Sequence, residues 1–268
     1  MSKKWLKVAL MVTAIATGTS IQVDAETVLY VPQDDRPVSL QYTVDTAKAA
    51  GMTVLTPPQN LISGKTYKGQ ADQIWNWVEQ NAGRADVMVL STDTLIYGGL
   101  VDSRKHNLPL STLENRLKRI EALKANHKNI RIYGFGTVMR SPRASGGGTE
   151  PSYYADYGPT IFQIAALQDK LDAGTLTQAE TQKLMSLQAS VPVEYLQDWF
   201  SRRQKNMQVN KDLIDEARNG VFAYFALGHD DTSQLSQSAL EGRYLNQYSK
   251  GIPRTQYGSF PGADQLGL

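Results

Sequence analysis

Short runs of β-branched, aromatic and other apolar residues recur along the chain, separated by longer segments with a different pattern. The runs are Thr27–Val31, Thr53–Leu55, Val87–Leu90, Ile130–Tyr133 and Val221–Ala226. They are nearly continuous rather than alternating between apolar and polar residues, and this pattern is typical of strands that are covered on both faces. We therefore predict a buried β-strand at each run.

The segments between these runs carry apolar residues at helical spacing. Asp72–Gln80 is one such segment. Another begins with Ser111–Glu114, which has the form of a capping box, and continues with apolar residues three and four apart: Leu113, Leu117, Ile120 and Leu123. This alternation of strand and helix predicts an α/β fold with a mostly parallel sheet flanked by helices.

Residues 159–219 lack the strand pattern altogether. Helices are expected over Ile161–Leu171, after the capping box Thr177–Glu180, and from Pro192 to the helix-stop pair Asn219–Gly220. We predict a helical insertion over residues 159–219. It is either a lid packed beside the sheet or one crossover connection that has grown long, because connection length is only weakly constrained.

Composition narrows the chemistry without naming a reaction. The chain has 268 residues with 28 basic and 26 acidic side chains, a formal net charge of +2, three His and no Cys. This balance gives no reason to expect nucleic-acid binding, because proteins that follow phosphate backbones concentrate Lys and Arg on one face. The absence of Cys excludes disulfides, thiolate metal sites and a Cys nucleophile, and three His are too few for a His-rich metal cage. We expect no cofactor.

The first residues have the pattern of an export signal. Three lysines within the first seven residues precede the apolar segment 8–21, and Val23–Ala25 supplies the small-x-small pattern that signal peptidase accepts. An uncleaved membrane anchor is the less favoured alternative, because a bilayer span needs ~20 apolar residues. We predict a signal peptide over residues 1–25, cleavage after Ala25, and a secreted or otherwise extracytoplasmic α/β domain over residues 26–268. After cleavage we expect no stable membrane insertion.

Polar residues gather where four of the predicted strands end. Asp34, Asp35 and Arg36 follow the first strand; Asp93, Tyr97 and Arg104 follow the third; Arg140 and Arg143 follow the fourth; and His229, Asp230 and Asp231 follow the last. The carboxyl ends of parallel strands lie along one edge, and ligands of open α/β sheets bind in the crevice outside that edge. We therefore predict that these side chains share one polar cleft.

Two of these groups also have a purely structural interpretation. Asp34 and Asp35 before Arg36 and Pro37 could form a self-neutralising turn. We favour function, because adjacent carboxylates at a strand end direct one side chain into the cleft. Asp93 could simply cap the turn that leads into Gly98–Gly99.

Three further motifs each allow more than one interpretation. His229–Asp231 offers an imidazole and carboxylates to a divalent metal, but adjacent side chains of an extended segment point to opposite sides, so a metal site is the less favoured alternative. Glycines 146–148 are not followed by a Lys-Ser/Thr pair, which excludes a phosphate loop and favours a mobile gate over the cleft. Tyr153–Tyr157 either stacks on a sugar ring or packs the insertion against the sheet.

Several of these motifs together resemble the bacterial DUF4127 family of uncharacterised proteins. They occur in order over Val28–Leu268, as Val31–Pro37, Asp93 with Tyr97–Leu100 and Ser103–Arg104, Met139–Arg140, Leu227–Asp231 and Gly262–Gln265. Members typically continue for about as long again, so the resemblance implies an N-terminal part or a truncated member, with a domain incomplete at its C-terminus. Members tend to have Asp or Gly at the position of His229, and Glu at that of Gln265. The family name carries no established reaction.

The preferred function is an exported hydrolase acting on carbohydrate. Asp34 or Asp35 would share the roles of proton donor and ionised partner with Asp230 or Asp231, and Asp93 would orient them. The predicted substrate-binding residues are Arg36, Tyr97, Arg104, Arg140, Arg143 and His229. The alternatives are an exported glycan-binding protein without catalysis, and a metal-dependent hydrolase that uses His229, Asp230 and Asp231.

Overall fold

The structure of the protein, a computed structural model, describes residues 25–144, 147–231, 233–264 and 266. The expected signal peptide, apart from Ala25, and Gln265 of the Gly262–Gln265 motif lie outside these residues. Among the residues described, no helix is both long enough and apolar enough to cross a membrane.

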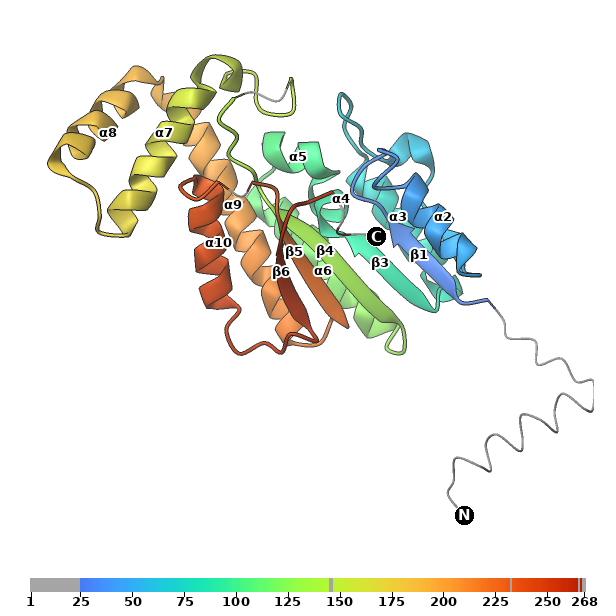
Figure 1. Cartoon of the computed structure of the whole chain (residues 1–268). Helices are drawn as coiled ribbons and strands as arrows, with labels where there is room; N and C mark the ends of the chain where they lie inside the picture. The colour runs from blue at the N-terminus through green and yellow to red at the C-terminus, as the bar shows by residue number, and fades with distance from the viewer. Residues whose placement is uncertain (1–24, 145–146, 232, 265, 267–268) are drawn as a thin grey trace, which may run out of the picture.

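Six strands form one parallel sheet in the order β2-β1-β3-β4-β5-β6 (Figure 1). The strands are β1 (Thr27–Val31), β2 (Thr53–Leu55), β3 (Val87–Ser91), β4 (Arg131–Val138), β5 (Tyr224–His229) and β6 (Tyr257–Pro261). In the centre of the sheet, Val28 of β1 lies opposite Val54 on one side and Val87 on the other. The predicted α/β fold with a parallel sheet is confirmed.

A strand forms at each of the five predicted runs, but the bounds differ for some of them and the sixth strand was not predicted. β1 and β2 have the predicted bounds, whereas β4 continues five residues further than predicted, to Val138, and β5 begins three residues later, at Tyr224. The strand β6 was not predicted, because Gly258 and Pro261 give its sequence the composition of a turn.

Helices connect the strands. They are α2 (Gln41–Ala49), α3 (Ala71–Asn81), α4 (Thr92–Tyr97), α5 (Leu100–Lys105), α6 (Leu110–Asn126), α7 (Tyr154–Asp172), α8 (Gln178–Ser190), α9 (Val193–Arg218) and α10 (Gln237–Tyr248), with single 3-10 turns at Gln59–Leu61 and Ala82–Arg84. The capping box predicted at Ser111 is wrong, because α6 already begins at Leu110 with Pro109 at its cap. The one predicted at Thr177 is confirmed, since its hydroxyl accepts the N–H of Glu180.

The region between β4 and β5 is helical, as predicted, and contains a second hydrophobic core. α7 begins at Tyr154, five residues before the expected boundary, and includes Pro159 in its second turn. Buried side chains of α7, α8 and the first half of α9, among them Ile161, Leu184 and Trp199, pack together. The second half of α9 packs on the sheet instead, so one helix belongs to both cores.

The two faces of the sheet are covered unequally. Helices α3, α6 and α9 pack on one face, over buried strand residues such as Leu29 and Met88. From β1 to β2 the chain moves across the sheet in one direction, and from β3 to β6 it moves in the opposite direction. Because crossover connections are right-handed, α2 lies on the opposite face from α3, α6 and α9. Apart from α2 and Leu266, no described element covers that face (Figure 1). A hollow of about 490 Å³ lies over β1, β3, β4 and β5.

Candidate functional site

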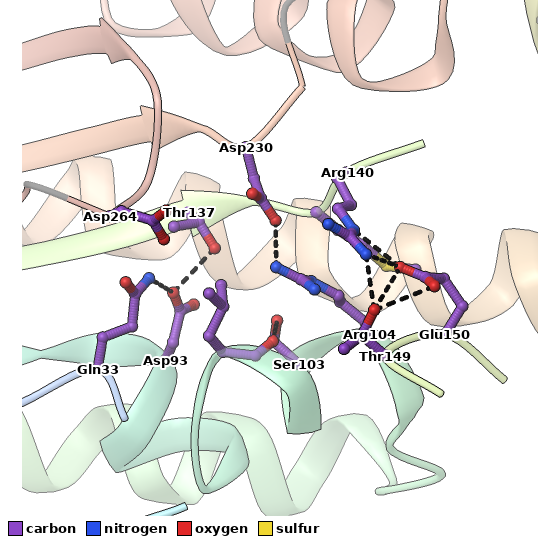
Figure 2. Close-up of polar contacts among 12 residues, drawn as sticks. Gln33, Asp93, Ser103, Arg104, Thr137, Arg140, Thr149, Glu150, Asp230 and Asp264 are labelled. Atoms are coloured by element: carbon purple, nitrogen blue, oxygen red, sulfur yellow. Dashed lines mark hydrogen bonds and ion pairs between the residues drawn. The ribbon is translucent and has the colours of Figure 1, made fainter. Parts of the chain in front are cut away.

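The candidate site lies at the carboxyl edge of the sheet, where the winding of the chain reverses direction. β1 stands between β2 and β3, and doubly wound sheets bind their ligands at such a switch point. Gln33 follows β1, and Asp93 lies in the first turn of α4 directly after β3. Gln33 Nε2 donates a hydrogen bond to Asp93 Oδ2 at 3.2 Å, so the two sides of the switch point meet at this carboxylate (Figure 2).

Asp93 is a buried carboxylate whose hydrogen-bond partners are neutral. Its position is set by Ser91, whose hydroxyl accepts the Thr94 N–H at 3.3 Å and caps α4. Thr137 Oγ1 of β4 donates to Asp93 Oδ2 at 2.8 Å. Burial raises the pKa of Asp93 to about 6, the hydrogen bonds from Thr137 and Gln33 oppose that rise, and the charge of Asp230 adds to it. Asp93 can therefore hold or release a proton near neutral pH.

Asp230, just after β5, is held by a buried cation. Arg104 Nη2 of α5 donates to Asp230 Oδ2 at 2.5 Å, and the exposed fractions of the two side chains are 5% and 14%. Burial raises the pKa of Asp230, and the charges of Arg104 and Arg140 oppose the rise. Burial also lowers the pKa of Arg104. This ion pair joins α5 to β5 across the edge.

A glycine turn brings α5 to this position. Gly98 ends α4 with a φ of +112°, a conformation that favours glycine. At Gly99, a Cβ atom would lie 1.8 Å from Ser63 Oγ, so the close approach is to the loop before α3. The glycine pair therefore serves both a positive-φ turn and tight packing.

Arg140 lies beside this pair and has its own carboxylate. Its Nε donates to Glu150 Oε1 at 2.8 Å and its Nη2 to Thr149 Oγ1 at 2.6 Å. The Glu150 side chain is 1% exposed, whereas that of Arg140 is 24% exposed. Arg203 of α9 donates to the backbone oxygens of Met139 and Arg140 at 2.7 and 2.9 Å, which holds this part of the chain in place.

Arg36 bridges two carboxylates at the other end of the edge. Its Nε lies 2.8 Å from Asp34 Oδ2, and its Nη2 lies 2.8 Å from Asp264 Oδ1, just after β6. Asp34 is buried and Asp264 is half-exposed. Asp35, by contrast, accepts a hydrogen bond from Tyr67 in the loop before α3, and this bond raises the pKa of Tyr67.

We use the name rim network for the charged residues that these interactions connect. They are Asp34, Arg36, Asp93, Arg104, Arg140, Glu150, Asp230 and Asp264. Asp230 acts on the pKa of Asp93, and Asp264 acts on that of Asp230, so the pairs are electrostatically coupled. In Figure 2 the labelled side chains of the network approach one another from several strand ends and from α5; they are Asp93, Arg104, Arg140, Glu150, Asp230 and Asp264. The edge thus gathers residues that are far apart in the sequence.

Five predicted site residues lie apart from the rim network, and one of them, Asp35, accepts its hydrogen bond from Tyr67. Tyr97 is buried in the main core, with its ring centroid 4.9 Å from that of His106. Arg143 is exposed and lies over the ring of Phe162, 5.2 Å from its centroid. His229 Nε2 lies 2.7 Å from Ser259 Oγ, and Asp231 Oδ1 accepts the Ser233 N–H at 2.9 Å.

His229 and Asp230 face different partners because they alternate along an extended strand end. A Cβ atom at Gly242 of α10 would lie 2.4 Å from His229 Cε1, so the imidazole packs against α10, while Asp230 turns toward Arg104. Across the described part of the chain, no three His, Cys, Asp or Glu side chains form a group that could hold a metal ion. This geometry does not favour a metal site built from His229, Asp230 and Asp231.

The tyrosines considered for sugar stacking pack within the helical region. The rings of Tyr153 and Tyr195 stack with centroids 4.7 Å apart, and the ring of Tyr154 lies 4.6 Å from that of Trp199. Tyr154 also donates to the Pro142 backbone oxygen at 2.8 Å. Of the two interpretations, these contacts favour packing.

The sequence-based prediction missed Gln33, Thr137 and Glu150, and it left Asp264 out of the site. Gln33 adjoins the predicted Asp34 and Asp35, and Thr137 lies three residues before Arg140. Their side chains are neutral, which made them less conspicuous than the charged neighbours. Glu150 follows the glycine-rich loop, so only the fold brings it to Arg140.

Comparisons with known proteins agree with the motifs. No significant match was found among curated proteins or among solved structures. The family model described as "Protein of unknown function (DUF4127)" matches residues 28–268, which is most of the chain and includes every residue of the rim network. The chain therefore belongs to the DUF4127 family.

Proposed function

We propose that this protein is an exported hydrolase that acts on carbohydrate at the rim network. The observation that carries the proposal is the state of Asp93, a buried carboxyl with neutral partners and a pKa raised to about 6. General acids work best when their pKa lies near the pH of the reaction. Guanidinium groups and carboxylates around it supply the hydrogen-bond donors and acceptors that sugar hydroxyls need.

The geometry favours a different division of roles from the one that the sequence suggested. Asp34 pairs with Arg36 and Asp35 with Tyr67, whereas Asp230 is the carboxylate whose charge acts on the pKa of Asp93. We assign proton donation to Asp93 and the role of ionised partner to Asp230, whose negative charge Arg104 stabilises. In glycoside hydrolysis the donor protonates the leaving oxygen while the ionised carboxylate assists attack at the sugar carbon.

A panel of glycans digested by the purified protein and analysed by mass spectrometry tests this function. We expect release of shorter products, and a rate lowered by ~10²–10⁴-fold in Asp93→Asn, because the variant keeps the shape but cannot donate a proton. Asp230→Asn should also be slower. Asp45→Asn, an exposed carboxylate on α2, is the matched control and should match the wild type. Undiminished cleavage by Asp93→Asn would contradict the assignment.

One observation favours the alternative of glycan binding without catalysis. Every guanidinium of the rim network already has a carboxylate partner, as expected of a rigid recognition surface. Calorimetric titration with the same glycans separates the two functions. Tight binding without any product after long incubation would support a binding protein rather than a hydrolase.

A further inference from the structure

We propose that the rim network selects sugars by charge, binding amino sugars best, neutral sugars less well and anionic sugars poorly. This inference rests on the proposed function and adds the class of substrate to it. It follows from the numbers of acidic and basic groups at the edge and from which of them are already paired.

Acidic groups outnumber basic groups in the rim network. Five carboxyl groups, those of Asp34, Asp93, Glu150, Asp230 and Asp264, meet three guanidinium groups, those of Arg36, Arg104 and Arg140. Above a pH of about 6, where Asp93 also loses its proton, the network is therefore negative. A cleft lined by charges of one sign raises the local concentration of ligands of the opposite sign.

No guanidinium of the network is left over for an anionic ligand. Arg104 holds Asp230, Arg140 holds Glu150, and Arg36 holds Asp34, and these three carboxylate side chains are 14%, 1% and 6% exposed. A uronate, sulfate or phosphate group that took any of the three arginines would leave a largely buried carboxylate without its cation, which is strongly unfavourable.

A protonated amine, by contrast, finds acceptors. Asp264, whose Oδ1 pairs with Arg36, is the most exposed carboxylate of the network, at 58% exposed. It lies on the same side of the edge as Thr137 (Figure 2), and its charge acts on the pKa of Asp230. Asp93 has only neutral hydrogen-bond donors, so its charge is not cancelled by a cation bound to it. An ammonium group has three donors and matches such acceptors.

A second observation indicates that the ligand also carries hydroxyl groups. Arg104 is 4% exposed, and its Nε has no hydrogen-bond partner among the described residues. Buried N–H groups are rarely left unpaired. Since Asp230 already balances the charge of Arg104, a neutral sugar hydroxyl is a sufficient acceptor for this N–H.

Three methyl glycosides that differ in one group test the selectivity: those of glucosamine, glucose and glucuronic acid. Binding is measured by NMR chemical-shift titration at pH 7 in low salt. We expect the glucosaminide to bind at least about tenfold more tightly than the glucuronide, with the glucoside between them. The difference should shrink as salt is added, because salt screens charge.

A pair of variants assigns the selectivity to this edge. Asp264→Asn removes a half-exposed carboxylate and should reduce the advantage of the glucosaminide about threefold or more. Glu194→Gln changes the overall charge equally at an exposed position in the first turn of α9 and should leave the advantage unchanged. The inference is overturned if the glucuronide binds as tightly as the glucosaminide, or if the two variants behave alike. If acidic glycans were then cleaved, the hydrolase function would still be supported and only the selectivity would be wrong. If no glycoside bound and no glycan of the panel were cleaved, both the function and the selectivity would be overturned.

Discussion

Asp93 follows β3 and Asp230 follows β5, so both lie at the carboxyl edge of the sheet. Both side chains are largely removed from water, but the charges around them differ. Around Asp93 the partners are the neutral groups of Gln33 and Thr137. Around Asp230 the partner is the guanidinium of Arg104, with Arg140 nearby. We refer to these as the neutral half and the ion-paired half of the edge.

The difference shows that burial and ion pairing have opposite effects on the protonation of a carboxyl group. Burial disfavours the charged form of a carboxyl, and neutral donors recover only part of the lost hydration. A buried cation stabilises the charged form directly, at the cost of tying two side chains together. The neutral half therefore keeps a group that can exchange a proton, while the ion-paired half keeps a fixed charge and joins helix to strand.

The largest expected effect comes from the ion-paired half. Arg104→Met would leave Asp230 buried without its cation, and we expect a loss of ~3–5 kcal/mol in the free energy of unfolding. Urea denaturation at pH 7 measures it. Arg131→Met, which breaks the exposed pair with Glu26, is the control and should cost at most about 1 kcal/mol. Equal losses in the two variants would show that the Arg104–Asp230 pair does not differ from a surface pair.

A somewhat smaller effect, dependent on pH, is expected in the neutral half. The pKa of Asp93 is raised from 3.8 to about 6 in the folded state, so the folded state binds the proton more tightly than the unfolded chain does. The stabilisation is complete below pH 4 and is lost as the pH rises through 6. Because a tenfold change in proton affinity corresponds to about 1.4 kcal/mol, the total is on the order of 3 kcal/mol.

Asp93→Asn should remove this step. Unfolding is measured in parallel for the wild type and the variant between pH 4 and pH 8, so that other titrating groups cancel in the difference. We expect the variant to gain stability relative to the wild type by about 3 kcal/mol over that range. A difference that stays constant with pH would mean that Asp93 titrates as it does in the unfolded chain.

The smallest expected effect concerns the donors to Asp93. Thr137→Val keeps the shape but removes the hydroxyl that donates at 2.8 Å, so the pKa of Asp93 should rise further, equivalent to on the order of 1.5 kcal/mol. Carbon-13 NMR titration of the Asp93 carboxyl measures the pKa, and the basic limb of any pH–activity profile should move upward with it. Thr43→Val, at a partly buried hydroxyl near Tyr30, is the control. An unchanged pKa in Thr137→Val would show that this hydrogen bond does not stabilise the charge.

Much of the fold could be predicted because its pattern is local. The runs at Thr27–Val31 and Thr53–Leu55 have the bounds of β1 and β2, and the Thr177 capping box starts α8 where it should. β6 was not predicted, because it is a short edge strand that contains Gly258 and Pro261. It forms only when β5 is already in place to pair with it.

The candidate site was predictable only in part. The sequence shows that polar residues follow the strands. Because the strands are parallel, their carboxyl ends lie at one edge, and this explains why that edge gathers Asp34, Asp93, Arg140 and Asp230. Which direction each side chain takes was not predictable. His229 and Asp230 are adjacent, yet one packs on α10 and the other pairs with Arg104.

The amino-acid sequence alone determined the α/β class, the parallel sheet and the family, because hydrophobic period and motif order depend on neighbours along the chain. Only the tertiary structure decided which carboxylates carry a cation, which one can exchange a proton near neutral pH, and that one face of the sheet is sparsely covered. The reason is that burial and charge pairing depend on distances in space, and residues as far apart in the sequence as Arg36 and Asp264 meet at this edge.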